Sequence, residues 1–249
     1  MSLLRPDELS SNQVAYKLFR SALEQIPWDV GEILSRESTS DDPRAELGWR
    51  LASRSYYAEQ AGLITAAALA AETDDVAYRF DMAAAAADEA RHADAFLRYA
   101  EHVGGAAESC LQEMSGLDDL LSSLPYLGKA LAHTVLEGFA ADEFLLLKHY
   151  FRGDHLADIY HFVRRDETRH VAVGVSYIAR ALRDDRVRDE YRAHSAEWLA
   201  NCRKYADVDD LGHVIAGLTG QDPAVVARWF HARHHNRMSA MNLLIEEGG

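Results

Sequence analysis

The sequence contains one pentapeptide pattern twice, as DEARH at residues 88–92 and as DETRH at residues 166–170. Two further glutamates, Glu59 and Glu137, each lie thirty residues before the glutamate of the copy that follows them. Within each copy the glutamate and the histidine are three residues apart, so their side chains share one face of a helix. A carboxylate followed by Glu-x-x-His, given twice, is the set of ligands with which helical bundles hold two metal ions.

Breaks in the helical pattern place the four glutamates at one height. Periodicity and punctuation predict four long helices, over about 43–73, 76–103, 125–151 and 154–182. Residue 74, midway between Glu59 and Glu89, falls in the first break, and residue 152, midway between Glu137 and Glu167, falls in the second. Fifteen residues at 1.5 Å rise put each glutamate roughly 22 Å from its turn. We therefore expect two helical hairpins, each contributing half of a site deep inside a bundle.

These elements predict an all-α protein. The segment from Gly104 to Pro125 must carry the chain back along the bundle, as the single long crossover of ferritin-like folds does. We therefore predict a ferritin-like four-helix bundle over about residues 43–184, preceded by an N-terminal helix at about 12–25. A C-terminal extension over about residues 186–245 is expected to contain three helices, at about 186–205, 209–218 and 223–245. All of residues 1–249 are expected to form a single domain.

Composition and charge exclude several functions. The formal net charge of −14 argues against binding to nucleic acids or anionic membranes, because either would need a concentrated basic face. The two cysteines, Cys110 and Cys202, are too few for a disulfide framework, an iron–sulfur cluster or a thiolate zinc site. The N-terminal segment lacks the apolar core of a secretory signal, and the longest apolar stretch, residues 63–71, is too short to span a bilayer. We expect a cytoplasmic protein that does not bind membranes.

Other side chains of the pentapeptides have supporting roles. Asp88 and Asp166 lie four residues before the histidines of their own copies, where a carboxylate accepts the free ring N–H of a ligand histidine. Arg91 and Arg169 are expected either to anchor these aspartates or to be surface charges. The alternative for the whole pattern is a set of solvated salt bridges. The alanines of residues 83–87 disfavour it, because an unpaired carboxylate among apolar neighbours is costly.

The doubled Asp-Glu-x-Arg-His form resembles the ferritin-like non-haem diiron carboxylate proteins, over about residues 46–182. It is most similar to their oxygen-activating branch, which includes bacterial multicomponent monooxygenases, acyl carrier protein desaturases and the radical-generating subunit of ribonucleotide reductase. The resemblance implies two iron ions, or one manganese and one iron, with dioxygen as co-substrate. The ligands it implies are Glu59, Glu89 and His92 for one ion and Glu137, Glu167 and His170 for the other.

Three positions depart from the patterns of particular subfamilies. Phe96 stands where the reductase subunit carries its radical tyrosine, so a stable tyrosyl radical is not expected. Ala141 stands where multicomponent hydroxylases have a threonine, and Val163 where arylamine oxygenases have an additional ligand histidine. His133, one turn before Glu137, is either an additional ligand or substrate contact, or a hydrogen-bonded core residue.

Several residues near the predicted site have two interpretations. Small side chains either leave room for dioxygen and a substrate or allow close helix packing; they are Gly62, Gly138, Ala140, Ala141 and Gly174. Tyr57 and Phe139 are candidates for the pocket wall. Asp142 and Glu143 are expected to form a solvated turn of their helix, with a role in the entry route of the metals as the alternative. The three histidines within residues 231–235 have arginine neighbours, which favours a basic patch or an exposed helix face over a second metal site.

These expectations favour an enzyme, a non-haem diiron oxidoreductase of monooxygenase type. It would hydroxylate, N-oxygenate or desaturate a small organic substrate, with electrons from an external ferredoxin or flavin reductase, because no motif for an internal redox cofactor is present. The alternative is an iron-handling ferroxidase or a rubrerythrin-like peroxidase, although the predicted C-terminal extension is better suited to roof a substrate pocket. A purely structural role for the metals is disfavoured, since burying so many carboxylates costs desolvation free energy and would stabilise the fold poorly. We also allow for a homodimer.

Overall fold

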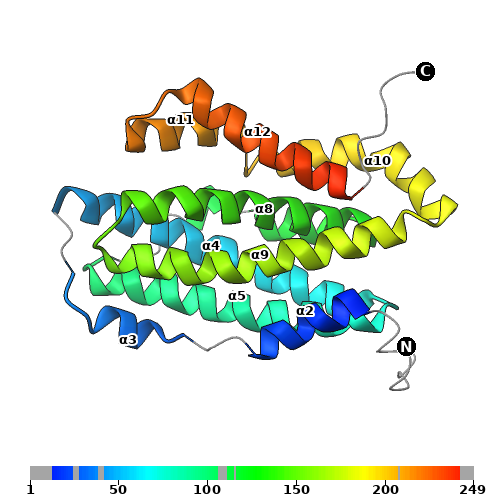
Figure 1. The fold of residues 1–249 in the computed structure, drawn as a ribbon, viewed down its shortest axis with the longest axis horizontal. Helices are drawn as coiled ribbons and strands as arrows, with labels where there is room; N and C mark the ends of the chain where they lie inside the picture. Colours follow the sequence, from blue (N-terminus) through cyan, green and yellow to red (C-terminus); the bar gives the residue numbers. More distant parts are fainter. Residues whose placement is uncertain are drawn as a thin grey trace.

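Four long helices form the centre of the molecule: α4 (Asp42–Glu72), α5 (Val76–His102), α8 (Tyr126–Tyr150) and α9 (His155–Ala181). The structure is a computed structural model that describes residues 13–24, 28–38, 42–105, 111–114, 116–206 and 208–241. All regular elements within these ranges are helices, which confirms the predicted all-α fold (Figure 1). None of these helices is long and apolar enough to cross a membrane.

Two tight turns make the four helices into two hairpins, α4 with α5 and α8 with α9. In the first turn Asp75 caps α5, because its side chain accepts a hydrogen bond from the N–H of Tyr78 at 3.0 Å. In the second turn Gly153 has a φ of 94°, a left-handed conformation that glycine adopts without steric cost. Asp154 then accepts a hydrogen bond from the N–H of Leu156 at 2.8 Å. The turns enclose residues 74 and 152, so the predicted hairpins are confirmed.

The connection between α5 and α8 contains two short helices, α6 (Leu111–Met114) and α7 (Leu117–Ser123), and both pack against α4. The single predicted crossover is therefore confirmed, although its residues 106–110 and 115 lie outside the described part of the chain. Because the crossover follows α4, its apolar side chains reach the space between α4 and α8.

The N-terminal segment covers one side of the bundle. Helix α2 (Gln13–Glu24) corresponds to the predicted N-terminal helix and packs against α5 and α9. A second short helix, α3 (Val30–Leu34), was not predicted; Asp29 caps it, and Val30 and Ile33 bury their side chains. It packs against the same two bundle helices, so the segment seals the α5–α9 face.

The C-terminal extension lies on the opposite side of the bundle, across α8 (Figure 1). Its three predicted helices are present as α10 (Asp185–Cys202), α11 (Val208–Thr219) and α12 (Pro223–Ala240). The last helix ends at Ala240 rather than 245, and residues 242–245 of the predicted helix lie outside the described residues.

Aromatic side chains fill the bundle one to two turns beyond the predicted ligands. Phe96 is fully buried, and its ring centroid lies 5.8 Å from those of Phe144 and Tyr160. These three rings come from three different bundle helices; Phe96 meets the other two at tilted angles, and Phe144 stacks on Tyr160. The core therefore fixes the spacing of the helices that carry the glutamates.

Candidate metal centre

The six side chains predicted as metal ligands converge, one or two from each bundle helix, and none is more than 8% exposed. Their ligand atoms form two groups, each with all atoms within 4.8 Å: Glu59, Glu89, His92 and Glu167, and Glu89, Glu137, Glu167 and His170. Glu89 and Glu167 belong to both groups. Two ions held by these groups would therefore share Glu89 and Glu167, a distinction that the spacing of the sequence does not make.

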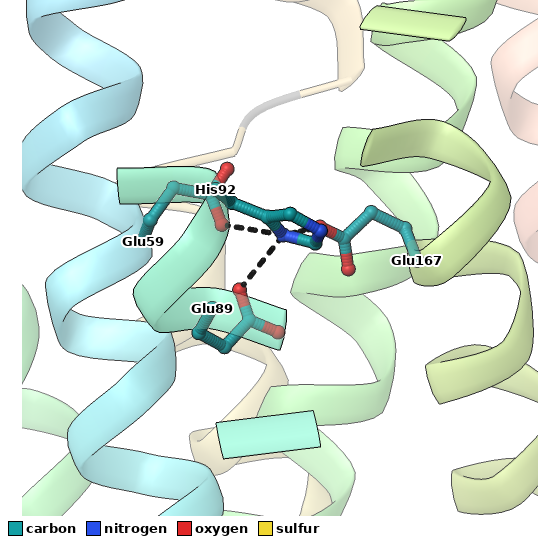
Figure 2. Close-up of side chains that lie close together, drawn as sticks. All are labelled: Glu59, Glu89, His92 and Glu167. Atoms are coloured by element: carbon teal, nitrogen blue, oxygen red, sulfur yellow. Dashed lines mark ion pairs between the residues drawn. The ribbon is translucent and has the colours of Figure 1, made fainter. Parts of the chain in front are cut away.

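The histidine rings turn their Nδ1 atoms towards the carboxylates. His92 Nδ1 lies 3.0 Å from an oxygen of Glu167 and 3.4 Å from oxygens of both Glu59 and Glu89 (Figure 2). His170 Nδ1 lies 3.0 Å from oxygens of Glu89 and Glu167. Two ligand atoms bound at right angles, each about 2.1 Å from one ion, are separated by about 3 Å. The observed separations match that arrangement.

Several buried atoms at this centre have no hydrogen-bond partner among the described residues. They are both carboxylate oxygens of Glu89, Oε1 of Glu167 and Nδ1 of His92, which lie near one another without hydrogen-bond alignment. Buried polar atoms are nearly always paired, so this set indicates a bound group that the protein itself does not supply. Carboxylate and imidazole donors in this number fit a pair of divalent iron or manganese ions.

The pKa shifts of the six side chains also indicate that the site favours positive charge. Burial raises the pKa of Glu59 and of Glu137 well above the ordinary range, and the charges of the other two carboxylates add to the rise. Burial opposes charge on His92 and His170, but the surrounding carboxylates outweigh it and raise the pKa of both rings well above the ordinary value. The site thus favours added positive charge, which protons on these groups or two divalent ions would supply.

Each histidine is held by the aspartate of the other pentapeptide. His92 Nε2 lies 3.4 Å from Asp166 Oδ2, and His170 Nε2 lies 3.3 Å from Asp88 Oδ2. The prediction that each aspartate serves the histidine of its own copy is wrong. Because Nδ1 points to the centre of the bundle, Nε2 of each ring points to the facing helix, α9 for His92 and α5 for His170. A carboxylate on the second ring nitrogen fixes the tautomer and orientation of a metal-binding histidine.

Both pentapeptide arginines anchor the aspartates. Arg91 donates hydrogen bonds to Asp88 Oδ1 at 2.5 Å and to Asp166 Oδ2 at 2.8 Å. Arg169 donates to Asp88 and lies 3.5 Å from Asp166 Oδ1. Of the two interpretations of these arginines, the structure therefore supports anchoring, and the resulting network links α5 to α9 beside the histidines.

Trp28 completes this network and was missed in the sequence. Its indole N–H donates to Asp166 Oδ2 at 3.2 Å, and its ring stacks on that of His92 with centroids 6.2 Å apart. The Arg91 guanidinium lies 5.4 Å from the Trp28 ring, a cation–π contact. Trp28 lies immediately before the Asp29 cap of α3, far from the pentapeptides in sequence, and no spacing marks it. The short helix α3 thus seats Trp28 against the centre.

A cavity of about 380 Å³ extends from the carboxylates between α4 and α8. Its deep end is lined by Glu59, Glu89, Glu137 and Glu167, and its outer end by residues 203–206 and α11. Phe139, a candidate for the pocket wall, lines it, and so does His133, which the sequence left open between a ligand or substrate contact and a core residue. Tyr57 and Ala141 are not among the described residues that do: Tyr57 packs in an apolar cluster, and Ala141 is buried while its neighbour Ala140 faces the cavity.

The small residues divide between the two interpretations. Gly62 and Ala140 line the cavity. Gly138 and Gly174 instead allow close packing, because a Cβ on Gly138 would lie 2.5 Å from Arg237 Nε, and one on Gly174 would overlap Thr134.

His133 lies between the cavity and Glu137. It is 3% exposed, its Nε2 is 3.5 Å from Glu137 Oε1, and burial lowers the pKa of its ring to about 4. At neutral pH it is therefore an uncharged imidazole that contacts a predicted ligand.

The predicted solvated turn at Asp142 and Glu143 is wrong. Asp142 is fully buried and receives hydrogen bonds from Arg233 and Arg237 of α12, while Glu143 lines the cavity. The sequence could not show this, because the face of α8 that carries Asp142 is covered by the distant C-terminal extension. The histidine cluster of residues 231–235 takes part in this packing: the ring of His234 stacks on Phe139, with centroids 5.0 Å apart.

Asp81 gives a pH-dependent prediction. It is 5% exposed, and burial raises its pKa from 3.8 to about 7; Asp75 adds to the rise, and Arg169, Arg180 and His170 oppose it. The folded state therefore binds the Asp81 proton more tightly than the unfolded state does. The protonated side chain stabilises the folded state fully below pH 3.8, the pKa in the unfolded chain, and this stabilisation is lost as the pH rises to about 7.

We expect Asp81→Asn to remove this dependence. Between about pH 4 and 7 the free energy of unfolding of the wild type should fall relative to the variant by up to about 1.4 kcal/mol per pH unit. Denaturant unfolding at a series of pH values, with equal metal content in both proteins, measures the difference. A difference that stays constant across this range would contradict the prediction.

A four-helix bundle with one crossover is the ferritin-like fold, and four carboxylates and two histidines lie at its centre here. Solved structures with this fold include R2-like ligand-binding oxidases. A variant of such an oxidase with an anaerobically reconstituted Mn/Fe cofactor is similar with a TM-score of 0.69 and 16% identity, over 91% of this chain and 92% of its own. An R2-like ligand-binding oxidase with an aerobically reconstituted Mn/Fe cofactor has a TM-score of 0.62 and 14% identity, over 92% and 93%.

No protein-family model matches the chain, and no curated protein matches its sequence. The structural likeness extends over nearly the whole of both chains, and it confirms the predicted ferritin-like fold. The chemistry must be argued from the residues themselves.

Proposed function

We propose that the protein is a dioxygen-activating oxidoreductase with a dinuclear iron or manganese–iron centre, and that it oxidises a small organic molecule bound in the cavity. One observation carries the proposal: four of the six candidate ligands line the same cavity whose outer end reaches the C-terminal extension. A molecule in this cavity would lie directly against the metal ligands. The Mn/Fe cofactors of the similar oxidases support a redox-active pair of ions.

The proposed roles follow from the geometry. Glu89 and Glu167, which belong to both groups of ligand atoms, would hold both ions; Glu59 and His92 would hold one of them, and Glu137 and His170 the other. The bound pair would supply redox chemistry, the oxidation of a C–H or N–H group by dioxygen with two electrons from an external ferredoxin or flavin reductase.

The remaining residues prepare the site. The crossed aspartates and arginines hold both rings with Nδ1 directed towards the carboxylates. Phe139 and Phe144 line the cavity beside the carboxylates and exclude water from the reacting group. His133, neutral and 3.5 Å from Glu137, lies beside that carboxylate at the edge of the cavity without a hydrogen bond to it.

Metal titration tests the proposal. Anaerobic addition of ferrous iron should give two tightly bound ions per chain, measured by elemental analysis after gel filtration. Exposure to oxygen should then consume dioxygen in an amount tied to the bound iron. Uptake of many further irons per chain without an organic substrate would favour the ferroxidase alternative, and failure to retain iron or manganese would contradict the dinuclear centre.

A further inference from the structure

The outer end of the cavity carries positive charge, although the chain as a whole has a formal net charge of −14. Arg54 of α4, with Arg203 and Lys204 of the turn between α10 and α11, line this end and are exposed to solvent. We name these three residues the mouth cluster. All three are exposed cationic side chains that line the cavity, so a ligand at this end can reach them.

The residues of the mouth cluster come from α4 and from the turn between α10 and α11, and a hydrogen bond joins these two segments. Arg54 Nη2 donates a hydrogen bond to the carbonyl oxygen of Tyr205 at 3.4 Å, and this contact ties the turn that carries Arg203 and Lys204 to α4. Asp210 also lines this end of the cavity, so the formal balance of the mouth is three cations against one acid. Glu143 lies within the cavity; burial raises its pKa, which reduces its negative charge there, while the nearby Arg54 acts in the opposite direction.

The cavity changes character between its two ends. Its walls are largely apolar and include Leu121, Leu136, Phe139, Phe144 and Leu211. Two divalent ions would neutralise the four carboxylates of its deep end, so the excess positive charge of the lining would lie at the mouth. A molecule with one anionic group would therefore enter with that group at the mouth cluster and its apolar part towards the candidate metal ligands.

We propose that the substrate is an apolar molecule with a single anionic group, a carboxylate or a phosphate, which Arg54, Arg203 and Lys204 bind at the mouth of the cavity. This inference rests on the proposed oxidase function for what happens at the deep end. It adds a class of substrate and assigns the turn between α10 and α11, part of the C-terminal extension, to substrate recognition.

Four probes with one apolar body and different end groups test the inference: 4-phenylbutyrate, 4-phenylbutyl phosphate, 4-phenylbutanol and 4-phenylbutylamine. Binding to the iron-loaded protein is measured by isothermal titration calorimetry at low and high salt. We expect the two anions to bind about tenfold more tightly than the alcohol, the scale of two or three solvent-exposed ion pairs, and this preference to shrink at high salt. The two anions together show whether the site prefers a carboxylate or a phosphate.

Two double variants locate the preference. Arg203→Ala/Lys204→Ala should reduce the preference for anions to less than about twofold and leave alcohol binding and iron content unchanged. Arg183→Ala/Arg186→Ala removes the same charge from exposed residues that do not line the cavity, and it should keep the wild-type preference.

Three results would overturn the inference: equal affinity for the alcohol and the anions, tighter binding of the amine, or a preference for anions that survives Arg203→Ala/Lys204→Ala. The last result would place the anion elsewhere, for instance on the metals themselves. Iron content and oxygen uptake are measured on the same samples. A protein that binds two irons and consumes oxygen without preferring anions retains the proposed function and loses this inference, whereas one that binds no metal loses the proposed function.

Discussion

Replacement of Glu167 by alanine is expected to empty both metal positions, whereas Glu59→Ala should leave one ion bound. Glu167 belongs to both groups of ligand atoms, and Glu59 belongs to only one. Loss of a bridging carboxylate removes a ligand from each ion and leaves their positive charges facing one another, so binding of both should fail. The measurement is metal content per chain after anaerobic loading and gel filtration: close to zero for Glu167→Ala and close to one for Glu59→Ala.

Two controls separate this result from misfolding. Alanine is the best helix former, so both variants should keep the far-ultraviolet circular dichroism of the wild type. Glu89→Ala, the second shared carboxylate, should behave like Glu167→Ala, and Glu137→Ala should behave like Glu59→Ala. Equal metal contents in the shared and unshared variants would show that these four carboxylates do not divide into bridging and terminal ligands.

The sequence was sufficient to predict the four-helix bundle and the height at which its four glutamates meet. Helical period and turn residues determine where each hairpin folds, and the equal thirty-residue offsets make the four glutamates meet at one height once the turns lie at residues 74 and 152. Such relations are local to one hairpin and follow from helix geometry alone. The convergence of Glu59, Glu89, Glu137 and Glu167 in the structure has this origin.

Contacts between the two hairpins could not be predicted from spacing within the sequence. The crossed pairing of Asp166 with His92 and of Asp88 with His170 depends on the rotation of α5 against α9, which no spacing within either copy records. Trp28 reaches Asp166 from a separate segment of the chain. In each case the contacts of a side chain depend on a partner that lies far away in the sequence, so its local sequence does not show its role.

The C-terminal extension shows the same limit, because Asp142 of α8 receives its hydrogen bonds from α12, about ninety residues later in the sequence. This carboxylate is fully buried; it accepts a hydrogen bond from Arg237 Nη1 at 2.7 Å and another from Arg233 Nε. The Arg237 guanidinium also lies 5.6 Å from the ring of Phe139, which lines the cavity. A single acid thus fixes both α12 and one wall of the proposed substrate site.

We expect Asp142→Ala to destabilise the protein by about 3–5 kcal/mol, because it leaves Arg237, whose side chain is only 12% exposed, without its counter-ion. Denaturant unfolding measures the loss, and limited proteolysis should cut α10 to α12 before the bundle. Asp189→Ala, which removes a 74% exposed acid from α10, should change stability by less than about 0.5 kcal/mol. Asp142→Leu combined with Arg237→Met should recover much of the lost stability, since apolar side chains often replace a buried ion pair without cost. If Asp142→Ala unfolds like the wild type, the ion pairs of Asp142 do not hold the extension, and its attachment must come from the apolar contacts alone.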